Sequence, residues 1–435
     1  MYHIIPISKV KKEIAVPGDK SISHRALLIS SLARGKTKII NFLNSQDTLA
    51  TLKCLRMLNV EIKYTKRKNE AEVNSRGPLF DISGKVKLNA QESGTTIRLL
   101  SGILVAQKFS SLLESKGSLR KRPMKRITYP LRLMGGKIKG KIKDKEEYPP
   151  LEIDPTDFLL GINYKLPQAS AQVKSAIMFA SLFSKGKTKI VEPQHSRDHT
   201  ERMLRLFGAK LKKVSKSITI EKSKLASPGE IFIPSDISSA SFFIALGLLL
   251  KDSEILIRNV GLNPTRSGFL KVLKRMGANI KVFNRKNYFE PYGDVLAKSS
   301  QLKGVEVEEK EIPLMIDELP ILMVCASFAK GRTIIKGLRE LKVKETDRLS
   351  SMVYNLKKAG VDIKATTYKG DNWKVEILGK RKINSVKFRS FSDHRTAMSL
   401  IVFGMASQKS FYLDDVTCID KSFPDFIPII NSLYG

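Results

Sequence analysis

Residues 203–212 read MLRLFGAKLK, a stretch in which an apolar helix ends at a glycine and a strand follows. Glycine is favoured at this point because it adopts the left-handed backbone conformation without steric cost. The pattern recurs along the chain, which makes it the end of a repeated unit. Its other copies are LKCLRMLNVEIK at 52–63, PLRLMGGKIK at 130–139, VLKRMGANIK at 272–281 and NLKKAGVDIK at 355–364.

Five residues align as equivalent turn positions, with spacings of 77, 72, 69 and 83 residues: Asn59, Gly136, Gly208, Gly277 and Gly360. A second pattern, an apolar helix followed by a glycine turn and a β-branched strand, appears at 31–40, 181–191 and 327–337. The 435 residues therefore predict about six copies of an αβ unit, each roughly 72 residues long. The closing helix of the last copy is shortened, at 430–435.

Each predicted unit opens with a polar segment directly before a strongly apolar helix. Ser, Thr or Asp in these segments is suited to capping the helix, and several segments carry Lys or Arg in the first turn. Converging helix N-termini would create a region that favours phosphates and carboxylates. The six segments are PGDKSISHRALLISSLA from 17, ESGTTIRLLSGILVA from 92, SAQVKSAIMFASLF from 170, SDISSASFFIALGLLL from 235, IDELPILMVCASFA from 316 and SDHRTAMSLIVFGMA from 392.

The segment KETDRLS at 344–350 joins acidic and basic residues to an apolar helix face. Lys344 and Arg348 are four residues apart, so we expect them to share one helix face and to form an anion site. Glu345 is expected on the core side of the first turn, where a poorly solvated carboxylate could move protons. A solvated ion pair is the alternative for an isolated cluster.

The composition is that of a soluble globular chain with two domains: 42% of the residues are hydrophobic and 27% are charged. No signal peptide is evident, and the longest apolar runs, at 242–250 and 319–329, are too short to span a membrane. The three cysteines, Cys54, Cys325 and Cys418, are far apart and show no metal-binding spacing. We therefore expect a reduced, cytoplasmic protein with no membrane partner and no bound metal.

The formal net charge of +35 raises the alternative of a nucleic-acid-binding protein. The lysines, however, are spread over the whole chain, and no helix-turn-helix, RNP or zinc-finger pattern accompanies them. Solvated surface lysine is the preferred interpretation, so no nucleic-acid partner is expected. A field of this sign would still steer small anions toward the protein.

Seven ordered motifs resemble the 5-enolpyruvylshikimate-3-phosphate synthase (3-phosphoshikimate 1-carboxyvinyltransferase) family over essentially the whole chain. They are PGDKSISHRAL at 17–27, ESGTTIR at 92–98, RKRPM at 120–124, SAQVKSA at 170–176, VKETDR at 343–348, SDHR at 392–395 and DKSFPDF at 420–426. The resemblance implies an α/β (α+β) fold of two domains, each with three βαβαββ units around a pseudo-threefold axis. One domain would be 17–235, and the other would combine 1–16 with 236–435.

The resemblance also implies the reaction. The family transfers the enolpyruvyl group of phosphoenolpyruvate to the 5-hydroxyl of shikimate 3-phosphate, releasing phosphate, in chorismate and aromatic amino acid biosynthesis. No cofactor is expected, in agreement with the absence of a Walker A string or a GxGxxG motif. The expected partners are the two small substrates alone, bound by a monomer.

The family's binding positions carry over to specific residues of this chain. For shikimate 3-phosphate they are Lys20, Ser21, Arg25, Ser170, Ala171, Gln172, Ser196, Arg197, Asp317 and Lys344. For phosphoenolpyruvate they are Lys20, Gly94, Arg122, Gln172, Arg348, Arg395 and Lys421. Fixed cations of this kind suit two substrates that each carry a phosphate and a carboxylate.

The same resemblance implies three catalytic residues. Asp317 matches the acid that contacts the 5-hydroxyl, and Glu345 matches the group that exchanges protons with the methylene carbon of phosphoenolpyruvate. Lys20 would contact both substrates. His394, beside Arg395, is expected to be a hydrogen-bonding residue, with a catalytic acid as the alternative. The assignment of each carboxylate to one step stays open at this point.

Three positions depart from the common family pattern. Ala171 replaces a frequent serine, and Glu92 and Glu340 stand where some members have asparagine. Four segments resemble the class II members, which are often tolerant of glyphosate: DKS at 19–21, SAQVK at 170–174, RDHT at 197–200 and NPTR at 263–266. We therefore expect resistance to glyphosate, although the unblocked Gly94 argues against it.

The nearest alternative is the related enolpyruvyl transferase that acts on UDP-N-acetylglucosamine. That enzyme would be expected to carry a loop cysteine and a Lys-Asn pair near the N-terminus. Here Lys20 is followed by Ser21, and the segment around Arg122 has no cysteine. Because the implied cations come from both halves of the chain, we also expect the domains to close on shikimate 3-phosphate.

Overall fold

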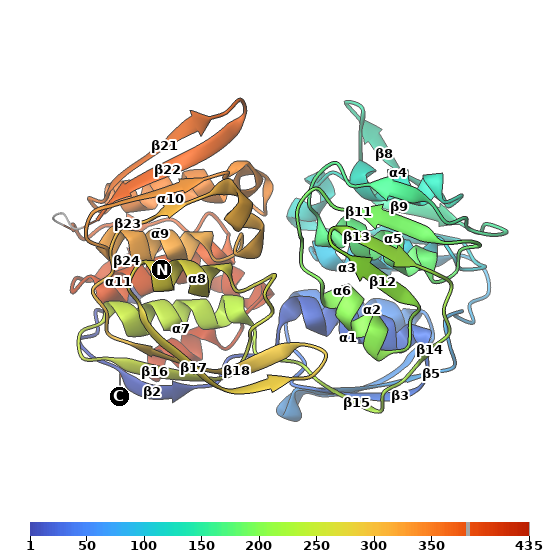
Figure 1. Cartoon of the computed structure of the whole chain (residues 1–435), viewed down its shortest axis with the longest axis horizontal. Helices are drawn as coiled ribbons and strands as arrows, with labels where there is room; N and C mark the ends of the chain where they lie inside the picture. Colours follow the sequence, from blue (N-terminus) through green and yellow to red (C-terminus); the bar gives the residue numbers. More distant parts are fainter. Residues whose placement is uncertain (380–382, 435) are drawn as a thin grey trace. The chain divides into compact units, whose positions relative to one another are not determined.

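The computed structural model describes residues 1–379 and 383–434, and the chain divides into two compact units. The first, here called the inserted unit, is Gly18–Ile233. The second, the split unit, combines Met1–Pro17 with Pro234–Gly435. Each unit is a mixture of small sheets and helices (Figure 1).

One βαβαββ module of the inserted unit shows the pattern that the others follow. Its elements are β6 (Val86–Asn89), α3 (Gly94–Leu104), β7 (Ser111–Glu114), α4 (Lys125–Leu133), β8 (Lys137–Lys143) and β9 (Glu146–Asp154). The strand order is β6-β7-β9-β8, with β6 and β7 parallel and the other pairs antiparallel. The parallel pair is joined by the first helix, as a parallel connection requires.

The next module repeats this order as β10-β11-β13-β12. Its elements are β10 (Asn163–Lys165), α5 (Ala171–Ser181), β11 (Thr188–Val191), α6 (His199–Leu206), β12 (Leu211–Val214) and β13 (Ser217–Ile220).

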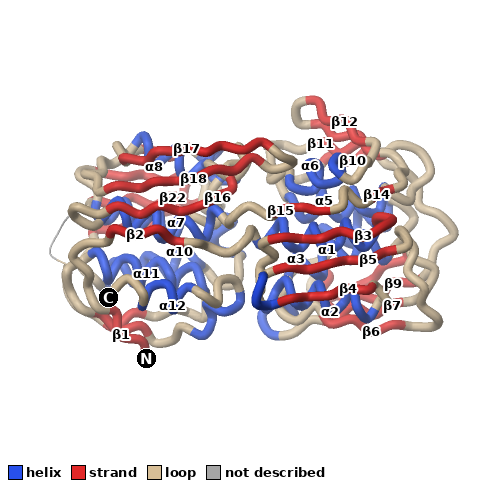
Figure 2. The backbone as a smooth tube through the Cα atoms, turned by 90° about the horizontal axis from the view of Figure 1, so that it is seen from below, coloured by secondary structure: helices blue, strands red, loops and turns tan. Residues whose placement is uncertain are grey.

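The first module of the inserted unit takes its leading strand from the far end of the unit. It contains α1 (Lys20–Leu32), β3 (Ala33–Ile40), α2 (Gln46–Met57), β4 (Glu61–Thr65) and β5 (Glu70–Ser75). The leading position, parallel to β3, is filled by β14 (Leu225–Ala226) and β15 (Glu230–Phe232). Figure 2 shows β15, β3, β5 and β4 side by side.

The split unit is built from the same module. One sheet is β17-β18-β16-β2 and the next is β19-β20-β22-β21. Their elements are β2 (Lys11–Ile14), α7 (Ile237–Leu249), β16 (Glu254–Gly261), α8 (Gly268–Arg275), β17 (Asn279–Asn287), β18 (Pro291–Lys298), β19 (Glu306–Val307), α9 (Leu319–Phe328), β20 (Arg332–Lys336), α10 (Arg348–Lys358), β21 (Asp362–Tyr368) and β22 (Asn372–Leu378).

The last sheet of the split unit joins the two ends of the described chain. It contains β23 (Lys387–Phe388) and β24 (Phe411–Leu413), with β1 (Tyr2–Ile4) antiparallel to β24. The helices of this module are α11 (His394–Ala406) and α12 (Phe426–Asn431). Short 3-10 helices complete the described chain: η1 (Lys66–Lys68), η2 (Gly117–Lys121), η3 (Glu309–Leu314), η4 (Arg339–Val343) and η5 (Thr417–Lys421).

The repeated helix ends adopt one hydrogen-bonding motif. At the end of α6, Gly208 has φ +86°, its N–H bonds to the Arg205 carbonyl, and the next N–H bonds to the Leu204 carbonyl. The ends of α2, α4, α8 and α10 repeat both bonds, which satisfy helix-end carbonyls. In the second copy the left-handed residue is Gly135, so the alignment on Gly136 was wrong by one residue.

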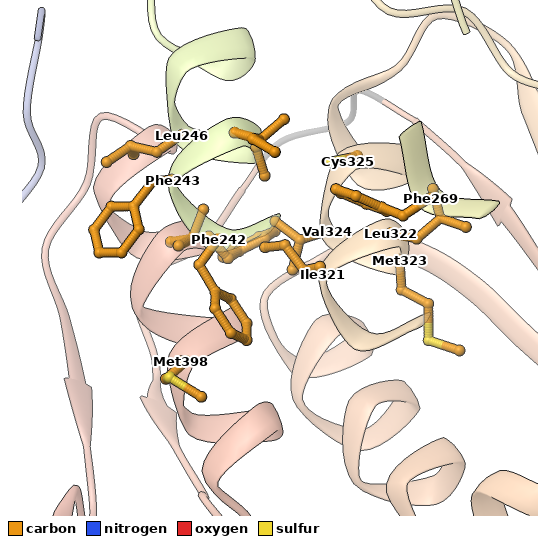
Figure 3. Close-up of a cluster of buried hydrophobic side chains, with 14 of the residues drawn as sticks. Phe242, Phe243, Leu246, Phe269, Ile321, Leu322, Met323, Val324, Cys325 and Met398 are labelled. Carbon is orange, nitrogen blue, oxygen red and sulfur yellow. The ribbon is translucent and has the colours of Figure 1, made fainter. Parts of the chain in front are cut away.

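The first helix of each module is buried on nearly all sides. In the split unit α7, α9 and α11 contact one another, and Figure 3 shows their side chains meeting around Phe242, Ile321 and Met398. A helix without a polar face has solvent-facing chemistry only at its ends. Among residues 1–379 and 383–434, no helix has the length and apolar character to cross a membrane.

The expected caps are present at five of these six helix starts. The capping side chains that accept a backbone N–H are Asp19, Ser93, Ser170, Asp236 and Asp393. The prediction was wrong for α9, where Glu318 occupies the cap position without a side-chain cap and Asp317 faces arginines instead.

Candidate functional site

The first residue of α1 is a partly buried cation. Lys20 Nζ lies 3.0 Å from Asp47 Oδ2, on α2, and both side chains are 19% exposed. An ammonium beside a helix N-terminus is suited to binding an anion. Ser21 follows it and is also partly exposed.

Arg25, one turn further along α1, links three helices. Its Nε donates to Thr200 Oγ1 on α6 at 2.6 Å, and its Nη2 donates to Ser175 Oγ on α5 at 3.0 Å. Its Nη1 donates to the Ser21 carbonyl at 2.9 Å. These three hydrogen bonds fix the orientation of the guanidinium, and a fixed guanidinium is suited to binding a phosphate or carboxylate.

The start of α3 brings three predicted residues together. A Cβ atom added to Gly94 would lie 2.9 Å from Arg122 Nη1 and 3.4 Å from Arg98 Nη1, so both guanidinium groups lie close to its backbone. Gln172 accepts from Arg98 Nη1 at 2.6 Å and donates to Thr95 Oγ1 at 3.1 Å. Gly94, Arg122 and Gln172 are thus neighbours, with Arg98 between them.

The starts of α5 and α6 hold the remaining predicted residues of this unit. Ser170 caps the helix through the N–H of Val173, and Ala171 is its first residue. Ser196 is buried in the turn before α6 and donates its hydroxyl hydrogen to Glu192. Arg197 follows Ser196 and is partly exposed.

In the split unit the buried guanidinium of Arg348 contacts three carboxylates. Arg348 Nε lies 2.8 Å from Asp393 Oδ2, its Nη1 lies 3.3 Å from Asp317 Oδ1, and its Nη2 contacts the carboxylate of Glu345. The Arg348 side chain is 1% exposed, whereas Glu345 is 33% exposed. Arg395 Nη1 donates to the Asp317 carbonyl at 3.1 Å. The structure therefore brings together Asp317, Glu345, Arg348 and Arg395.

The charges of this cluster stabilise one another. Burial alone would lower the pKa of Arg348, but Asp393, Glu345 and Asp317 together raise it above its ordinary value. Burial would likewise raise the pKa of Asp393, yet Arg348 and His394 hold it below its usual range. Both groups are therefore charged at neutral pH, and Asp393 also caps α11 through the N–H groups of Arg395 and Thr396.

The segment at 344–350 folds differently from its expected form. Helix α10 begins at Arg348 and is capped by Asp347, so Glu345 and Lys344 precede the helix. The predicted shared helix face of Lys344 and Arg348 was wrong, because Lys344 directly follows the preceding 3-10 helix and lies before α10. Glu345 reaches Arg348 from this turn.

Two further predicted residues lie at element ends. Lys421 is the last residue of η5, and His394 is the first residue of α11 and is buried.

Two buried cations of the inserted unit escaped the sequence analysis. Arg98 and Lys174 are almost fully buried, although each stands within an otherwise apolar helix. Lys174 Nζ contacts Glu192 Oε2 at 3.0 Å and Glu201 Oε1 at 2.7 Å. The signal that could have identified them is a charged residue inside a strongly apolar stretch. Such a residue is buried with its helix, and a buried charge requires partners.

His24 predicts a pH effect on stability. Its ring is buried with Nδ1 2.7 Å from Thr51 Oγ1, and burial, then Lys20 and Arg25, lowers its pKa well below 6.5. Below about pH 6.5 the unfolded chain binds a proton that the folded chain refuses, so stability falls as pH falls. We expect His24→Asn to reduce this slope by up to about 1.4 kcal/mol per pH unit.

Urea unfolding followed by circular dichroism between pH 7.5 and 5.0 measures the slope. His195→Asn is the matched control, because it makes the same substitution at an exposed histidine of the same unit. A wild-type slope that persists in His24→Asn would contradict the prediction.

Comparison with known proteins identifies relatives over the full chain. A family model described as EPSP synthase (3-phosphoshikimate 1-carboxyvinyltransferase) matches residues 4–430. The 3-phosphoshikimate 1-carboxyvinyltransferase of Petrotoga mobilis is 47% identical over 433 residues, which cover 99% of this chain and 98% of the relative. The protein of the same name from Thermodesulfovibrio yellowstonii is 46% identical over 439 residues, which cover 100% of both chains.

Solved structures show the same similarity. EPSP synthase from Acinetobacter baumannii has a TM-score of 0.88 at 39% identity, covering 99% of this chain and 97% of that chain. The enolpyruvyl transferase NikO from Streptomyces tendae has a TM-score of 0.77 at 15% identity, covering 99% of this chain and 97% of that chain. This similarity shows a common fold.

Proposed function

The chain belongs to the EPSP synthase family, and from this premise we propose how its residues carry out the reaction. The enzyme is a 3-phosphoshikimate 1-carboxyvinyltransferase: it transfers the enolpyruvyl group of phosphoenolpyruvate to the 5-hydroxyl of shikimate 3-phosphate and releases phosphate. The family, the two-domain enolpyruvyl transferase fold and this activity were all expected from the sequence and are confirmed.

The inserted unit supplies most of the proposed contacts to shikimate 3-phosphate. Arg25 supports this assignment best, because three hydrogen bonds fix the orientation of its guanidinium among helices α1, α5 and α6. The other proposed contacts from this unit are Lys20, Ser21, Ser170, Ala171, Gln172, Ser196 and Arg197. Asp317 and Lys344 of the split unit complete the set.

Phosphoenolpyruvate would be bound by residues of both units. Gly94 allows an anion to approach the α3 N-terminus, and Arg122 and Gln172 flank it. Arg348, Arg395 and Lys421 belong to the split unit, while Lys20 would contact both substrates. Two anionic groups on this substrate account for the number of cations.

The chemistry requires two proton transfers. The methylene carbon of phosphoenolpyruvate gains a proton as its neighbouring carbon becomes electrophilic, and the 5-hydroxyl loses a proton as it attacks that carbon. We assign the first transfer to Glu345 and the second to Asp317. The tetrahedral adduct then expels phosphate, assisted by the cations that bind it.

The observation that carries this assignment is the contact of one buried guanidinium with both acids. Arg348 holds Asp317 and Glu345 at its two terminal nitrogens, which keeps the acids near each other and near a fixed positive charge. Phosphate release assayed with phosphoenolpyruvate and each acceptor tests the activity. Release should depend on shikimate 3-phosphate, and release with UDP-N-acetylglucosamine alone would contradict it.

The division of these residues between units predicts a change in dimensions. Closure of the two domains on shikimate 3-phosphate, which we expect from the sequence, would reduce the radius of gyration. Small-angle X-ray scattering with and without the ligand measures this change, with shikimate at the same concentration as control. Identical scattering curves with saturating ligand would contradict the proposed closure.

Glyphosate is expected to inhibit this enzyme less than family members that carry a serine at the position of Ala171. Ala171 is the first residue of α5 and has no hydroxyl group to donate to an anionic ligand. The measurement is the inhibition constant beside the KM for phosphoenolpyruvate, with Ala171→Ser as the matched variant. Micromolar inhibition combined with an ordinary KM would contradict the expected resistance.

The remaining expectations concern partners and location. We propose a cytoplasmic monomer that acts on small substrates and does not use nucleic acid. The scattered lysines support this view, because phosphate-tracking proteins concentrate their charge on one surface. A DNA retardation assay at physiological salt and light scattering of the purified chain test these two statements.

A further inference from the structure

A cluster of buried charged side chains in the inserted unit is hydrogen-bonded to Ser196. Lys174, Glu192 and Glu201 are completely buried, and the ammonium of Lys174 lies 3.0 Å from one carboxylate and 2.7 Å from the other. Taking three charges out of water is costly unless each is paired. The best-attested use of such a cluster is to fix one local conformation.

Glu192 connects the cluster to the turn before α6. Its Oε2 contacts Lys174, while its Oε1 accepts hydrogen bonds from the Ser196 hydroxyl and from the Ser196 N–H, the latter at 3.3 Å. Glu192 follows β11 directly, and Ser196 stands four residues later. One carboxylate therefore closes the turn at 192–196 and accepts from both donors of Ser196, so the hydroxyl hydrogen must turn away from Glu192 before it can be donated to another group.

Glu201 shares the ammonium but has no such role. It lies on α6, where its Oε1 contacts Lys174 and lies 3.8 Å from Lys213 Nζ. Within the part of the chain that the structure describes, it makes no hydrogen bond to Ser196. The two glutamates thus form a natural comparison: removing either leaves Lys174 with one carboxylate, and only Glu192 anchors the turn.

We propose that Glu192, held in place by Lys174, is a positioning residue that fixes Ser196 for the phosphate group of shikimate 3-phosphate. The proposal rests on the proposed function, in which Ser196 contacts that phosphate. The bond from the Ser196 N–H keeps the turn closed while the hydroxyl hydrogen turns to the phosphate, so the turn does not have to be ordered when the ligand binds. Glu192 acts through Ser196 and does not touch the substrate.

Replacing each glutamate with leucine separates two effects. One is the loss of the anchor of the turn at 192–196, and the other is the loss of a buried negative charge beside Lys174. Isothermal titration with shikimate 3-phosphate and with shikimate, which lacks the phosphate, measures both affinities. We expect Glu192→Leu to weaken shikimate 3-phosphate binding about tenfold, the size of one charge-assisted hydrogen bond, with shikimate affinity within about twofold of wild type. Glu201→Leu should leave both affinities unchanged.

Ser196→Ala distinguishes failure of the inference from failure of the underlying assignment. It should cause a loss similar to that of Glu192→Leu, and the double variant should lose little more than either single variant. A normal affinity in Ser196→Ala would remove Ser196 from the proposed site, and the inference with it. A loss in Ser196→Ala beside a normal affinity in Glu192→Leu would overturn the inference alone.

Two other results would overturn the positioning role. Equal losses for shikimate and shikimate 3-phosphate in Glu192→Leu would show a general disturbance of the unit. Tighter binding of shikimate 3-phosphate would show that Glu192 competes with the phosphate for the Ser196 hydroxyl hydrogen. If Glu192→Leu does not fold, Glu192→Asp moves the carboxylate away by one methylene and should give the same selective loss.

Discussion

Replacing Glu345 with glutamine is expected to lower kcat about 10²- to 10⁴-fold, the usual contribution of a positioned proton-transfer group. Asp317→Asn should have an effect of the same size. Both acids contact the buried guanidinium of Arg348, and Glu345 is 33% exposed, so it is accessible to a ligand. An amide keeps the shape of each side chain but cannot exchange the proton.

Solvent exchange separates the roles of the two acids. Phosphoenolpyruvate recovered from deuterated buffer after incubation with shikimate 3-phosphate and enzyme should carry deuterium on its methylene carbon. We expect Glu345→Gln to abolish this exchange and Asp317→Asn to reduce product formation more than exchange. Undiminished exchange in Glu345→Gln would assign the methylene proton to another group.

The matched control is Glu309→Gln, which removes an exposed carboxylate from η3 of the same unit. Its turnover should remain within about twofold of wild type, because surface substitutions have small effects. Circular dichroism spectra of all variants establish that the fold is intact. Wild-type turnover in Glu345→Gln, Asp317→Asn and Lys20→Met together would contradict the site assignment.

Replacing Arg348 with methionine is expected to destabilise the split unit by about 3–5 kcal/mol, the cost of leaving buried charge without its partner. Asp393 has no exposed surface, and Asp317 and Glu345 contact the same guanidinium. Without Arg348 the three carboxylates repel one another. Activity should be lost as well, since Arg348 is a proposed ligand of phosphoenolpyruvate.

The pH dependence of this destabilisation has a definite sign. In the wild type the pKa of Asp393 is lowered, so its stabilising contribution is present above its unfolded value and is lost as pH falls through the folded value. Without Arg348, burial raises this pKa, so a charged Asp393 costs stability at neutral pH. The deficit of the variant should therefore be larger at pH 8 than at pH 5.

Urea unfolding followed by tryptophan fluorescence measures this deficit in the relevant unit. Trp373, the single tryptophan of the chain, lies on β22 of the split unit. Arg258→Met is the control: Arg258 also pairs with two carboxylates, but its side chain is 41% exposed, so its loss should matter far less. Equal unfolding midpoints for wild type and Arg348→Met at pH 8 would contradict the expectation.

The architecture was predictable because its signals are local. A helix that ends in Leu-Phe-Gly before a strand encodes its own hydrogen-bonding motif at Gly208, and repetition made the pattern readable. The error at Gly136 arose where two adjacent glycines could both take the left-handed position. The pairing of the leading strands could not be predicted, because β15 and its partner β3 lie near opposite ends of the sequence of the inserted unit.

The candidate site was likewise predictable only in its local features. Family motifs named the residue types, yet the partners of buried arginines are distant in sequence: Arg25 bonds to Thr200, 175 residues away. The missing cap of α9 was also unpredictable, because Asp317 looks like a capping residue until its arginine partners are known. Lys174 was missed because its two glutamates belong to other elements.

The order in which the strands of the split unit are made affects how this unit folds during synthesis on the ribosome. Strand β1 pairs with β24, so Tyr2 has its partner only once Leu413 has been made. At about 5–20 residues per second, roughly 400 intervening residues take about 20–80 s. The inserted unit is contiguous in sequence, so it can fold during this time, whereas β1 stays without its strand partner until β24 has been made.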